Sequence, residues 1–250
     1  MTEKTLQNPL LTKKWIRALI GLTLLVGLCG LLLFYGIIRF NYPSLKAYPI
    51  RGIDISHHQG VINWQKLQNE NIDFVFIKAT EGGDFVDPTF YANWDSSLAN
   101  GYVTGAYHFY RLCKTGKEQA ANVIATVPRL KGCFAPAIDL EFGGNCSHGK
   151  SEKQIISEIQ DFMNAIEKHY DQRPVIYATA EFYDTYLRNQ FTDYPIWIRN
   201  IYRKPNLPDK RDWTFWQFAN RAHLKGIDSY VDLNVMNGSQ EDLMNLTIAN

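Results

Sequence analysis

The sequence lacks an excess of charge of either sign. Its 250 residues carry 26 lysines and arginines against 25 aspartates and glutamates, a formal net charge of +1. No basic run occurs in the body of the chain, so nucleic acid is not an expected partner. The chain also lacks internal repeats and low-complexity stretches, and 46% of its residues are hydrophobic. This composition excludes a disordered, collagen-like or coiled-coil protein.

Cysteines and metal-binding spacings are equally scarce. The sequence holds four cysteines and no H-x-H, H-E-x-x-H or C-x-x-C motif. Histidines and carboxylates could still combine in a metal site, and the candidates are Asp54, His57, His58, His108, Asp139 and Glu141. Because His57 and His58 are adjacent, only one of them could face the centre of a site from an extended strand. We therefore expect neither a metal nor a cofactor.

One long apolar run stands apart from this near-neutral average. Residues 18–38 contain no charged side chain, and about 20 apolar residues cross a bilayer as a helix. The run is longer than the core of a signal peptide, and no small-x-small cleavage site follows it. Bases at positions 13, 14 and 17 place the N-terminus in the cytoplasm by the positive-inside rule. We expect a cytoplasmic tail at 1–17, a transmembrane signal-anchor at 18–38, a linker at 39–49 and one folded domain at 50–250.

The folded part alternates between two kinds of segment. Eight short β-rich runs are candidate strands: 52–56, 74–79, 103–110, 134–140, 174–178, 195–198, 214–218 and 230–235. Five helical patterns lie between the earlier ones: 64–69, 88–100, 117–126, 151–169 and 180–188. Strands that alternate with helices predict a parallel sheet. The count predicts an α/β barrel near the lower size limit of the (β/α)8 class, with loops alone joining the last strands.

Polar side chains gather where these strands end. They include Asp54, Glu81, Tyr107, His108, Asp139, Glu141, Tyr177, Trp197, Gln217 and Asp232. In a parallel barrel the carboxyl ends of the strands meet at one face, which is where active sites of such barrels lie. We therefore expect these residues to surround one site.

The most chemically suggestive pair is Asp139 and Glu141. Residues i and i+2 of a strand point to the same side, about 6.6–6.8 Å apart along the chain. Two neighbouring carboxyls suppress each other's ionisation, so one can remain a proton donor while the other is charged. Cleavage of a glycosidic bond needs such a pair. The alternative is a solvated Asp and Glu at a strand end, and Asp54 and Asp232 on the same rim argue against it.

Aromatic residues favour a carbohydrate substrate. Five of them fall at or near the same strand ends: Tyr107, Tyr110, Tyr177, Trp197 and Trp216. Flat rings stack on sugar faces, although aromatic rings also fill hydrophobic cores.

The three cysteines of the folded part allow at most one internal disulfide. Cys113 and Cys146 follow neighbouring strands on the side of the expected site, whereas Cys133 precedes a strand at the opposite end. We predict a bridge between Cys113 and Cys146, the alternative being three buried thiols.

Several of these segments together resemble glycoside hydrolase family 25, whose members are lysozymes (N-acetylmuramidases). The resemblance covers residues 51–238. It rests on D-I-S-H-H-Q-G at 54–60, F-I-K-A-T-E-G at 76–82, G-A-Y-H-F-Y at 105–110, D-L-E at 139–141, W-Q at 216–217 and V-D-L-N at 231–234. One position departs from the family pattern, since Asn71 stands where a Gly or Arg usually precedes the second strand.

The resemblance implies a (β/α)5(β)3 barrel that hydrolyses the β-1,4 bond between N-acetylmuramic acid and N-acetylglucosamine in peptidoglycan. Glu141 would be the general acid and Asp139 would hold the substrate acetamido group, while Asp54 and Asp232 complete the catalytic rim. Asp228 is close enough in sequence to compete with Asp232 for its role. Substrate contacts are expected from Tyr107, His108, Tyr110, Tyr177, Trp197, Trp216, Gln217 and Glu81.

The expected setting is a bacterial one. The chain would be a monomer held by a single span in the cytoplasmic (inner) membrane, with its barrel in the periplasm or outside the cell. Two alternatives remain open at this point. One is a non-catalytic protein that binds cell-wall glycan on the same barrel, and the other is a metal-dependent polysaccharide deacetylase.

Overall fold

The computed structural model describes residues 9–35, 37–38, 41–147 and 149–249. The chain divides into two compact units, residues 1–40 and residues 41–250. Residues 1–8 of the expected tail, residue 36 of the expected anchor and residues 39–40 of the expected linker lie outside the described residues.

The first unit is one apolar helix, α1 (Pro9–Phe34). Its segment Lys13–Phe34 has a mean hydropathy of 2.3 and none of it is buried. Exposing that much apolar surface to water costs about 25 cal/mol per Å², so the helix needs apolar surroundings. Its length and composition are those of a membrane-crossing helix or of a signal sequence.

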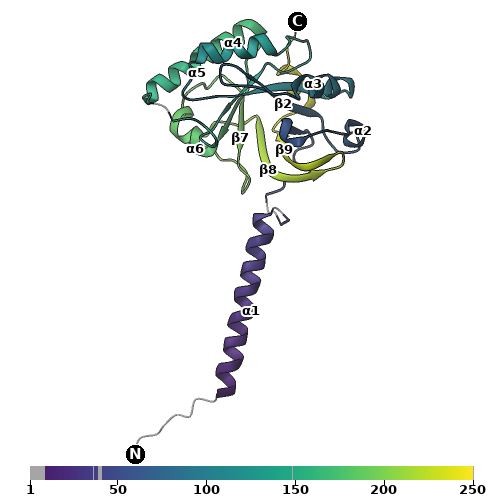
Figure 1. The fold of residues 1–250 in the computed structure, drawn as a ribbon, viewed down its shortest axis with the longest axis vertical. Helices are drawn as coiled ribbons and strands as arrows, with labels where there is room; N and C mark the ends of the chain where they lie inside the picture. The colour runs from purple at the N-terminus through teal and green to yellow at the C-terminus, as the bar shows by residue number, and fades with distance from the viewer. Residues whose placement is uncertain (1–8, 36, 39–40, 148, 250) are drawn as a thin grey trace, which may run out of the picture. The chain divides into compact units, whose positions relative to one another are not determined.

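The second unit is an α/β barrel (Figure 1). Its strands are β1 (Arg51–Ile55), β2 (Phe74–Glu81), β3 (Phe85–Val86), β4 (Val103–Phe109), β5 (Ala137–Leu140), β6 (Ile176–Thr179), β7 (Ile196–Arg199), β8 (Phe215–Leu224) and β9 (Ile227–Met236). Its helices are α2 (Trp64–Leu67), α3 (Phe90–Ala99), α4 (Gly116–Thr126), α5 (Glu152–Tyr170), α6 (Ala180–Phe182) and α7 (Gln240–Asn245). A 3-10 turn η1 (His57–Gln59) follows β1, and the π-helical turn η2 (Tyr183–Leu187) continues α6.

The strands follow the order β1-β9-β8-β7-β6-β5-β4-β2-β3, and a further pairing of β1 with β2 closes the ring. The following strand pairs are parallel: β1–β2, β2–β4, β4–β5, β5–β6, β6–β7 and β7–β8. Strand β9 is antiparallel to both β8 and β1. Helices α2 to α6 lie in the earlier connections, and β7, β8 and β9 follow one another without a helix.

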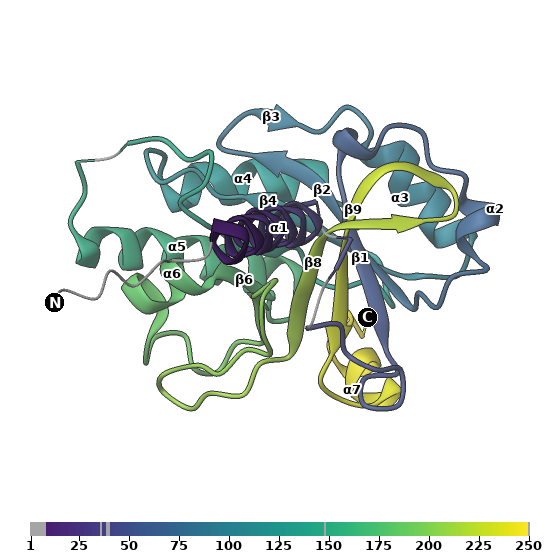
Figure 2. The same cartoon turned by 90° about the horizontal axis from the view of Figure 1, so that it is seen from below.

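The antiparallel direction of β9 corrects one expectation. We expected Asp232 to reach the site because it ended a parallel strand. Asp232 instead lies in the middle of β9, where the register pairs it with Asp54 of β1. Strand β9 also forms a long hairpin with β8 (Figure 2), and Gly226 at its tip accepts a hydrogen bond from the backbone of Asn63 at 2.8 Å.

Side chains that point into the barrel form an aromatic plug. The plug consists of Phe74, Phe76, Phe134, Trp197 and Phe215, whose rings contact one another. A Cβ atom at Gly52 or Gly105 would collide with these rings. Glycine is therefore required at both positions because the plug fills the space beside the backbone.

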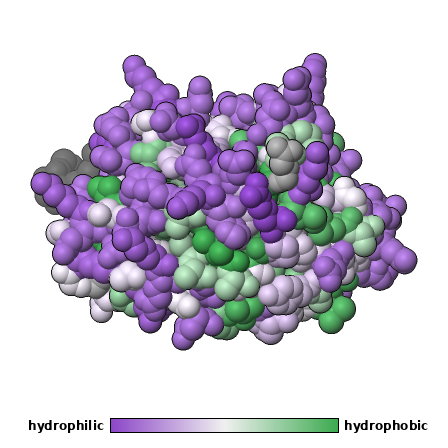
Figure 3. Space-filling view, turned by 90° about the horizontal axis from the view of Figure 1, so that it is seen from above, coloured by the Kyte–Doolittle hydropathy of each residue, from purple (hydrophilic) through white to green (hydrophobic). Residues whose placement is uncertain are grey.

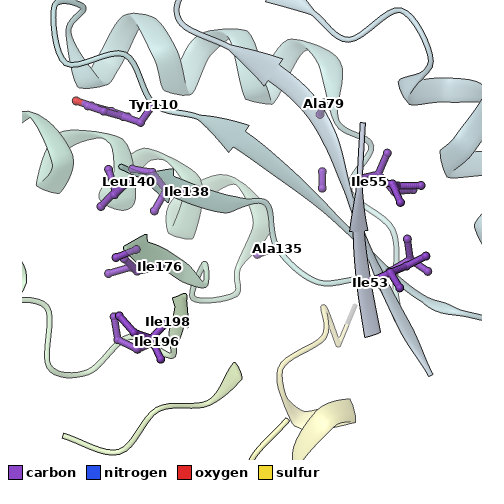
Figure 4. Close-up of a cluster of buried hydrophobic side chains, with 14 of the residues drawn as sticks. Ile53, Ile55, Ala79, Tyr110, Ala135, Ile138, Leu140, Ile176, Ile196 and Ile198 are labelled. Carbon is purple, nitrogen blue, oxygen red and sulfur yellow. The ribbon is translucent and has the colours of Figure 1, made fainter. Parts of the chain in front are cut away.

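Side chains on the other face of the strands form a second, outer layer beneath the helices. Figure 4 shows part of it, with isoleucines of β1, β5, β6 and β7. Helix α5 covers this layer with a stripe of buried residues: Ile155, Ile159, Phe162, Met163, Ile166 and Tyr170. It begins with a capping box in which Ser151 and Gln154 satisfy each other's backbone amides. On the face shown in Figure 3, hydrophilic side chains predominate and apolar side chains form patches between them.

Residues 41–49 act as a strap across the outer face of β8, where no helix lies in the described chain. Tyr48 packs against Trp213 and Trp216 at centroid distances of 5.6 and 6.3 Å. Asn41 donates a 2.7 Å hydrogen bond to the carbonyl of Phe218. The strap therefore covers aromatic rings that a crossover helix would otherwise bury.

We expect Tyr48→Ala to lower the free energy of unfolding by about 1–3 kcal/mol, because the variant uncovers Trp213 and Trp216. Thermal unfolding of the full chain in detergent measures this loss. Tyr202→Ala is the matched control, since the Tyr202 side chain is 78% exposed. Equal melting temperatures for the two variants would mean that the packing of Tyr48 on the two tryptophans does not stabilise the fold.

Candidate active site

A cavity of about 540 Å³ opens at the end of the barrel above the aromatic plug. Its acidic lining residues are Asp54, Asp139, Glu141 and Asp232. Tyr107, Phe109, Tyr177 and Trp197 contribute its aromatic surface, and Arg199 and His58 its basic groups. Four carboxyl groups in one cavity are the most distinctive chemical feature of the molecule.

Asp54 is held in a fixed orientation by a buried hydrogen-bond network. Asn234 donates to one oxygen of its carboxylate at 2.7 Å, and Gln217 donates to both oxygens at 3.0 and 3.1 Å. Each amide is oriented in turn by an aromatic donor. The indole of Trp197 donates to Asn234 at 2.8 Å, and the hydroxyl of Tyr177 donates to Gln217 at 3.0 Å.

Asp54 and Asp232 form an unequal acidic pair. Burial raises the pKa of Asp54, while the hydrogen bonds from Asn234, Gln217 and Asp232 act in the opposite direction. Burial raises the pKa of Asp232 well above its usual value, and the charge of Asp54 raises it further. The hydrogen bond between the two carboxyls lowers the pKa of Asp54 and raises that of Asp232, so Asp54 is the stronger acid of the pair.

Asp139 and Glu141 point into the same cavity from β5 and the residue after its end. Burial raises the pKa of Asp139 well above its usual value, and the charges of Glu141 and Asp54 add to this effect. One oxygen of the buried Asp139 carboxyl has no hydrogen-bond partner in the described part of the chain. Burial also raises the pKa of Glu141, opposed first by the charge of Arg199.

Two cations that the sequence analysis did not identify balance these acids. Arg199 ends β7 and lines the cavity, and its charge lowers the pKa of all four carboxyls. Lys78 of β2 lowers the pKa of Asp139 and Glu141 while its own ammonium group contacts Glu81 at 2.7 Å. Both residues sit on inward-facing strand positions, and that periodicity could have identified them.

The predicted substrate contacts divide according to the face of the strand. Tyr107, Tyr177, Trp197 and Gln217 line the cavity. His108, Tyr110 and Trp216 are not among the residues that line it. Each occupies a strand position, or follows one, that points outward because side chains alternate with period two.

The three outward residues have other partners. His108 contacts Thr80 and Gln119 and stacks on Phe162, and burial lowers its pKa to about 4. Tyr110 packs edge-on against the same Phe162. Trp216 lies beneath the strap and donates to the carbonyl of Asn200 at 2.8 Å.

Glu81 also lies outside the cavity lining. It pairs with Lys78 at 2.7 Å and with Arg111 at 3.3 Å. Glu81 therefore helps to orient the Lys78 ammonium group.

Comparison with known proteins assigns the barrel to a family. The family model of glycosyl hydrolases family 25 matches residues 53–227. The chain belongs to glycosyl hydrolase family 25. It is therefore a glycoside hydrolase, which agrees with a cavity lined by carboxyl groups.

Relatives of this family 25 hydrolase cover most of its length. Protein YegX of Escherichia coli O157:H7 is 38% identical over 218 residues, which are 84% of this chain and 79% of YegX. Lysozyme M1 of Streptomyces globisporus is 31% identical over 208 residues, 79% of this chain and 71% of that lysozyme. The structure of a family 25 glycosyl hydrolase from Bacillus anthracis matches with a TM-score of 0.78 at 38% identity, and covers 83% of this chain and 98% of that one.

Four more residues that sequence patterns did not predict as substrate contacts line the cavity of this family 25 hydrolase: His58, Phe109, Gly143 and Asn220. His58 was expected only as a possible metal ligand. Among the described residues, no group of three or more His, Cys, Asp or Glu side chains is placed to hold a metal ion.

Beside the cavity, a disulfide joins Cys113 to Cys146 with their Cα atoms 5.9 Å apart. It links the loop after β4 to the loop after β5, which also carries Glu141. Cys133 is a buried free thiol, and burial raises its pKa to about 11.

We expect Arg199→Met to move the whole pH–activity profile of this hydrolase to higher pH. Removing the positive charge raises the pKa of every carboxyl in the cavity. Both the acid and the base of the reaction therefore remain protonated to a higher pH. Initial rates against pH measure the shift. Arg203→Met, which removes an exposed charge outside the cavity, should leave the profile in place. A downward or absent shift in Arg199→Met would contradict the electrostatic role.

Proposed function

We propose that this family 25 hydrolase cleaves the β-1,4 bond between N-acetylmuramic acid and N-acetylglucosamine in peptidoglycan. The observation that carries this proposal is the cavity in which four carboxyls of unequal acidity surround one space. The relatives named lysozyme M1 and autolytic lysozyme support the substrate class.

Glu141 is the general acid in this proposal. It is the more exposed member of the Asp139–Glu141 pair, so it can reach the oxygen of the leaving sugar. Burial raises its pKa, which favours the protonated form that a general acid needs. After the bond breaks, the same carboxylate can take a proton from the incoming water.

Asp139 orients the acetamido group of the sugar whose bond is cleaved. Its free carboxyl oxygen is aimed at no protein donor, which leaves it available to accept the acetamido N–H. That hydrogen bond favours the ionised form of Asp139 and so opposes the rise in its pKa that burial causes. The acetamido oxygen can then attack the anomeric carbon as an internal nucleophile.

Asp54 and Asp232 supply the opposite wall of the site. Ionised Asp54, held by Gln217 and Asn234, presents a fixed negative charge to the positive charge that develops on the sugar ring. The hydrogen bond between Asp232 and Asp54 raises the pKa of Asp232, which disfavours a second negative charge beside Asp54. The sugar lies against three aromatic side chains that line the cavity, those of Tyr107, Tyr177 and Trp197.

We also propose an architecture and a cellular location for the whole chain. The barrel is of the (β/α)5(β)3 kind, spans residues 50–250 and acts as a monomer. Residues 18–38 are an uncleaved anchor in a bacterial cytoplasmic membrane, with residues 1–17 inside the cell, a linker at 39–49 and the barrel in the periplasm or outside the cell. The mean hydropathy of α1 supports this placement.

We expect Glu141→Gln to lower the rate of cell-wall clearing about 10²- to 10⁴-fold, because the amide cannot donate a catalytic proton. Loss of turbidity of purified walls measures the rate, and mass spectrometry of the released fragments should find N-acetylmuramic acid at the new reducing ends. Glu152→Gln, an exposed change at the start of α5, is the control. Wild-type protein that binds walls without releasing fragments would instead identify a non-catalytic glycan-binding protein.

The proposed anchor makes a separate prediction. We expect the full-length chain in the membrane fraction, with the barrel degraded by protease added outside intact spheroplasts. Replacing two leucines of the apolar run with aspartates should release the protein from the membrane, since each charge costs about 2.5–3.5 kcal/mol at the centre of a span. A shortened mature chain free in the medium would identify a cleaved signal sequence.

A further inference from the structure

The side chain of Asn145 uses all of its hydrogen-bonding capacity between two loops beside the cavity. Its amide nitrogen donates to the carbonyl of Tyr110 at 2.8 Å and to that of Glu141 at 2.9 Å. Its oxygen accepts from the backbone amides of Leu112 and Cys146, both at 2.9 Å. Asn145 therefore connects the backbone after β4 directly to the backbone of Glu141.

The Glu141 carboxyl has no hydrogen bond to any side chain or backbone group of the described residues, whereas Gln217 and Asn234 alone donate three to Asp54. Glu141 also lies one residue beyond Leu140, where β5 ends. The ladder of the sheet therefore does not hold its backbone. The place of its carboxyl depends on the loop that follows, and the contact made there with the Glu141 backbone is the one from Asn145.

Two more ties hold the same pair of loops together. The disulfide between Cys113 and Cys146 joins them covalently at the residue after Asn145. Arg111 donates to the carbonyl of Gly144 at 2.6 Å, on the other side of Asn145. Asn145 thus stands between a covalent link and a charged hydrogen bond, and both limit its movement.

We propose that Asn145 is a positioning residue for Glu141, and that the Cys113–Cys146 disulfide maintains this role. The proposal rests on Glu141 being the general acid of the proposed function. Asn145 touches no substrate; it fixes the backbone from which the Glu141 carboxyl reaches the leaving oxygen. Activity then depends on an oxidising compartment, because reduction of the disulfide frees the loop that carries Asn145.

The test is Asn145→Ala, assayed on two substrates. On purified cell walls we expect kcat to fall about 10- to 100-fold with little change in KM, because the acid is displaced rather than removed. On a nitrophenyl β-glycoside of N-acetylmuramic acid the loss should be much smaller, because that leaving group departs with little protonation. Loss of loop structure in general would impair both substrates alike.

Two further variants complete the experiment. Asn100→Ala removes a side-chain hydrogen bond to the carbonyl of Ser96, away from the cavity, and controls for lost stability. The paired change Cys113→Ser and Cys146→Ser should reproduce the substrate pattern of Asn145→Ala, and it provides the same test if the alanine variant does not fold.

Three outcomes separate the hypotheses. A loss of kcat on cell walls but not on the nitrophenyl glycoside supports the positioning role of Asn145. Equal losses on both substrates, or activity like that of Asn100→Ala, overturn it, provided that Glu141→Gln is inactive on walls. Full activity of Glu141→Gln would instead overturn the assignment of Glu141 as the acid, and with it the proposed function.

Discussion

The aromatic plug inside the barrel is the constraint on which the rest of the structure depends. Phe74, Phe76, Phe134 and Phe215 occupy the interior so fully that Gly52 and Gly105 can carry no side chain. Polar inward-facing residues are therefore excluded from the middle of the barrel. They collect at the open end, where Asp54, Asp139 and Asp232 lie on top of a hydrophobic floor.

Burial above the aromatic plug raises the pKa values of the four cavity carboxyls. Desolvation is the largest cause of the raised pKa at each of the four acids, and mutual repulsion adds to it at three of them, Asp232, Asp139 and Glu141. Arg199 and Lys78 lower the pKa values again without neutralising the cavity. The result is a set of carboxyls whose acidities differ, and a glycoside hydrolase requires carboxyls in different protonation states.

The same architecture explains the division between the well-held and the loosely held acids. Asp54 lies within a strand and inside a network of Gln217, Asn234, Trp197 and Tyr177. Glu141 lies past the end of its strand, so loop contacts must hold it. The loops after β4 and β5 are joined by the hydrogen bonds of Asn145, by the hydrogen bond from Arg111 to Gly144 and by a disulfide. The later part of the barrel compensates differently, with the 41–49 strap covering β8 in place of a helix.

Much of this arrangement was predictable from local patterns. Hydrophobic runs, helix caps and strand-end carboxyls placed every major strand, helix α5 with its Ser151 cap, and the residues Asp54, Asp139 and Glu141 at the site. Period-two alternation was available too, and applying it would have excluded His108 and Trp216 and found Arg199. The direction of β9 also had a local signal, because only Lys225 and Gly226 separate β8 from β9 and a two-residue turn joins antiparallel strands. Expected strands that ended at 218 and began again at 230 left this turn out.

The sequence by itself determined the apolar helix, the α/β barrel and the acidic character of its open end, since each follows from residue type at short spacing. Only the tertiary structure decided that Asp232 faces Asp54 across an antiparallel pair, that Trp216 is covered by the strap, and that Asn145 contacts the carbonyl of Tyr110. Those facts depend on which distant segments meet when the ring closes, and closure is a property of the whole chain.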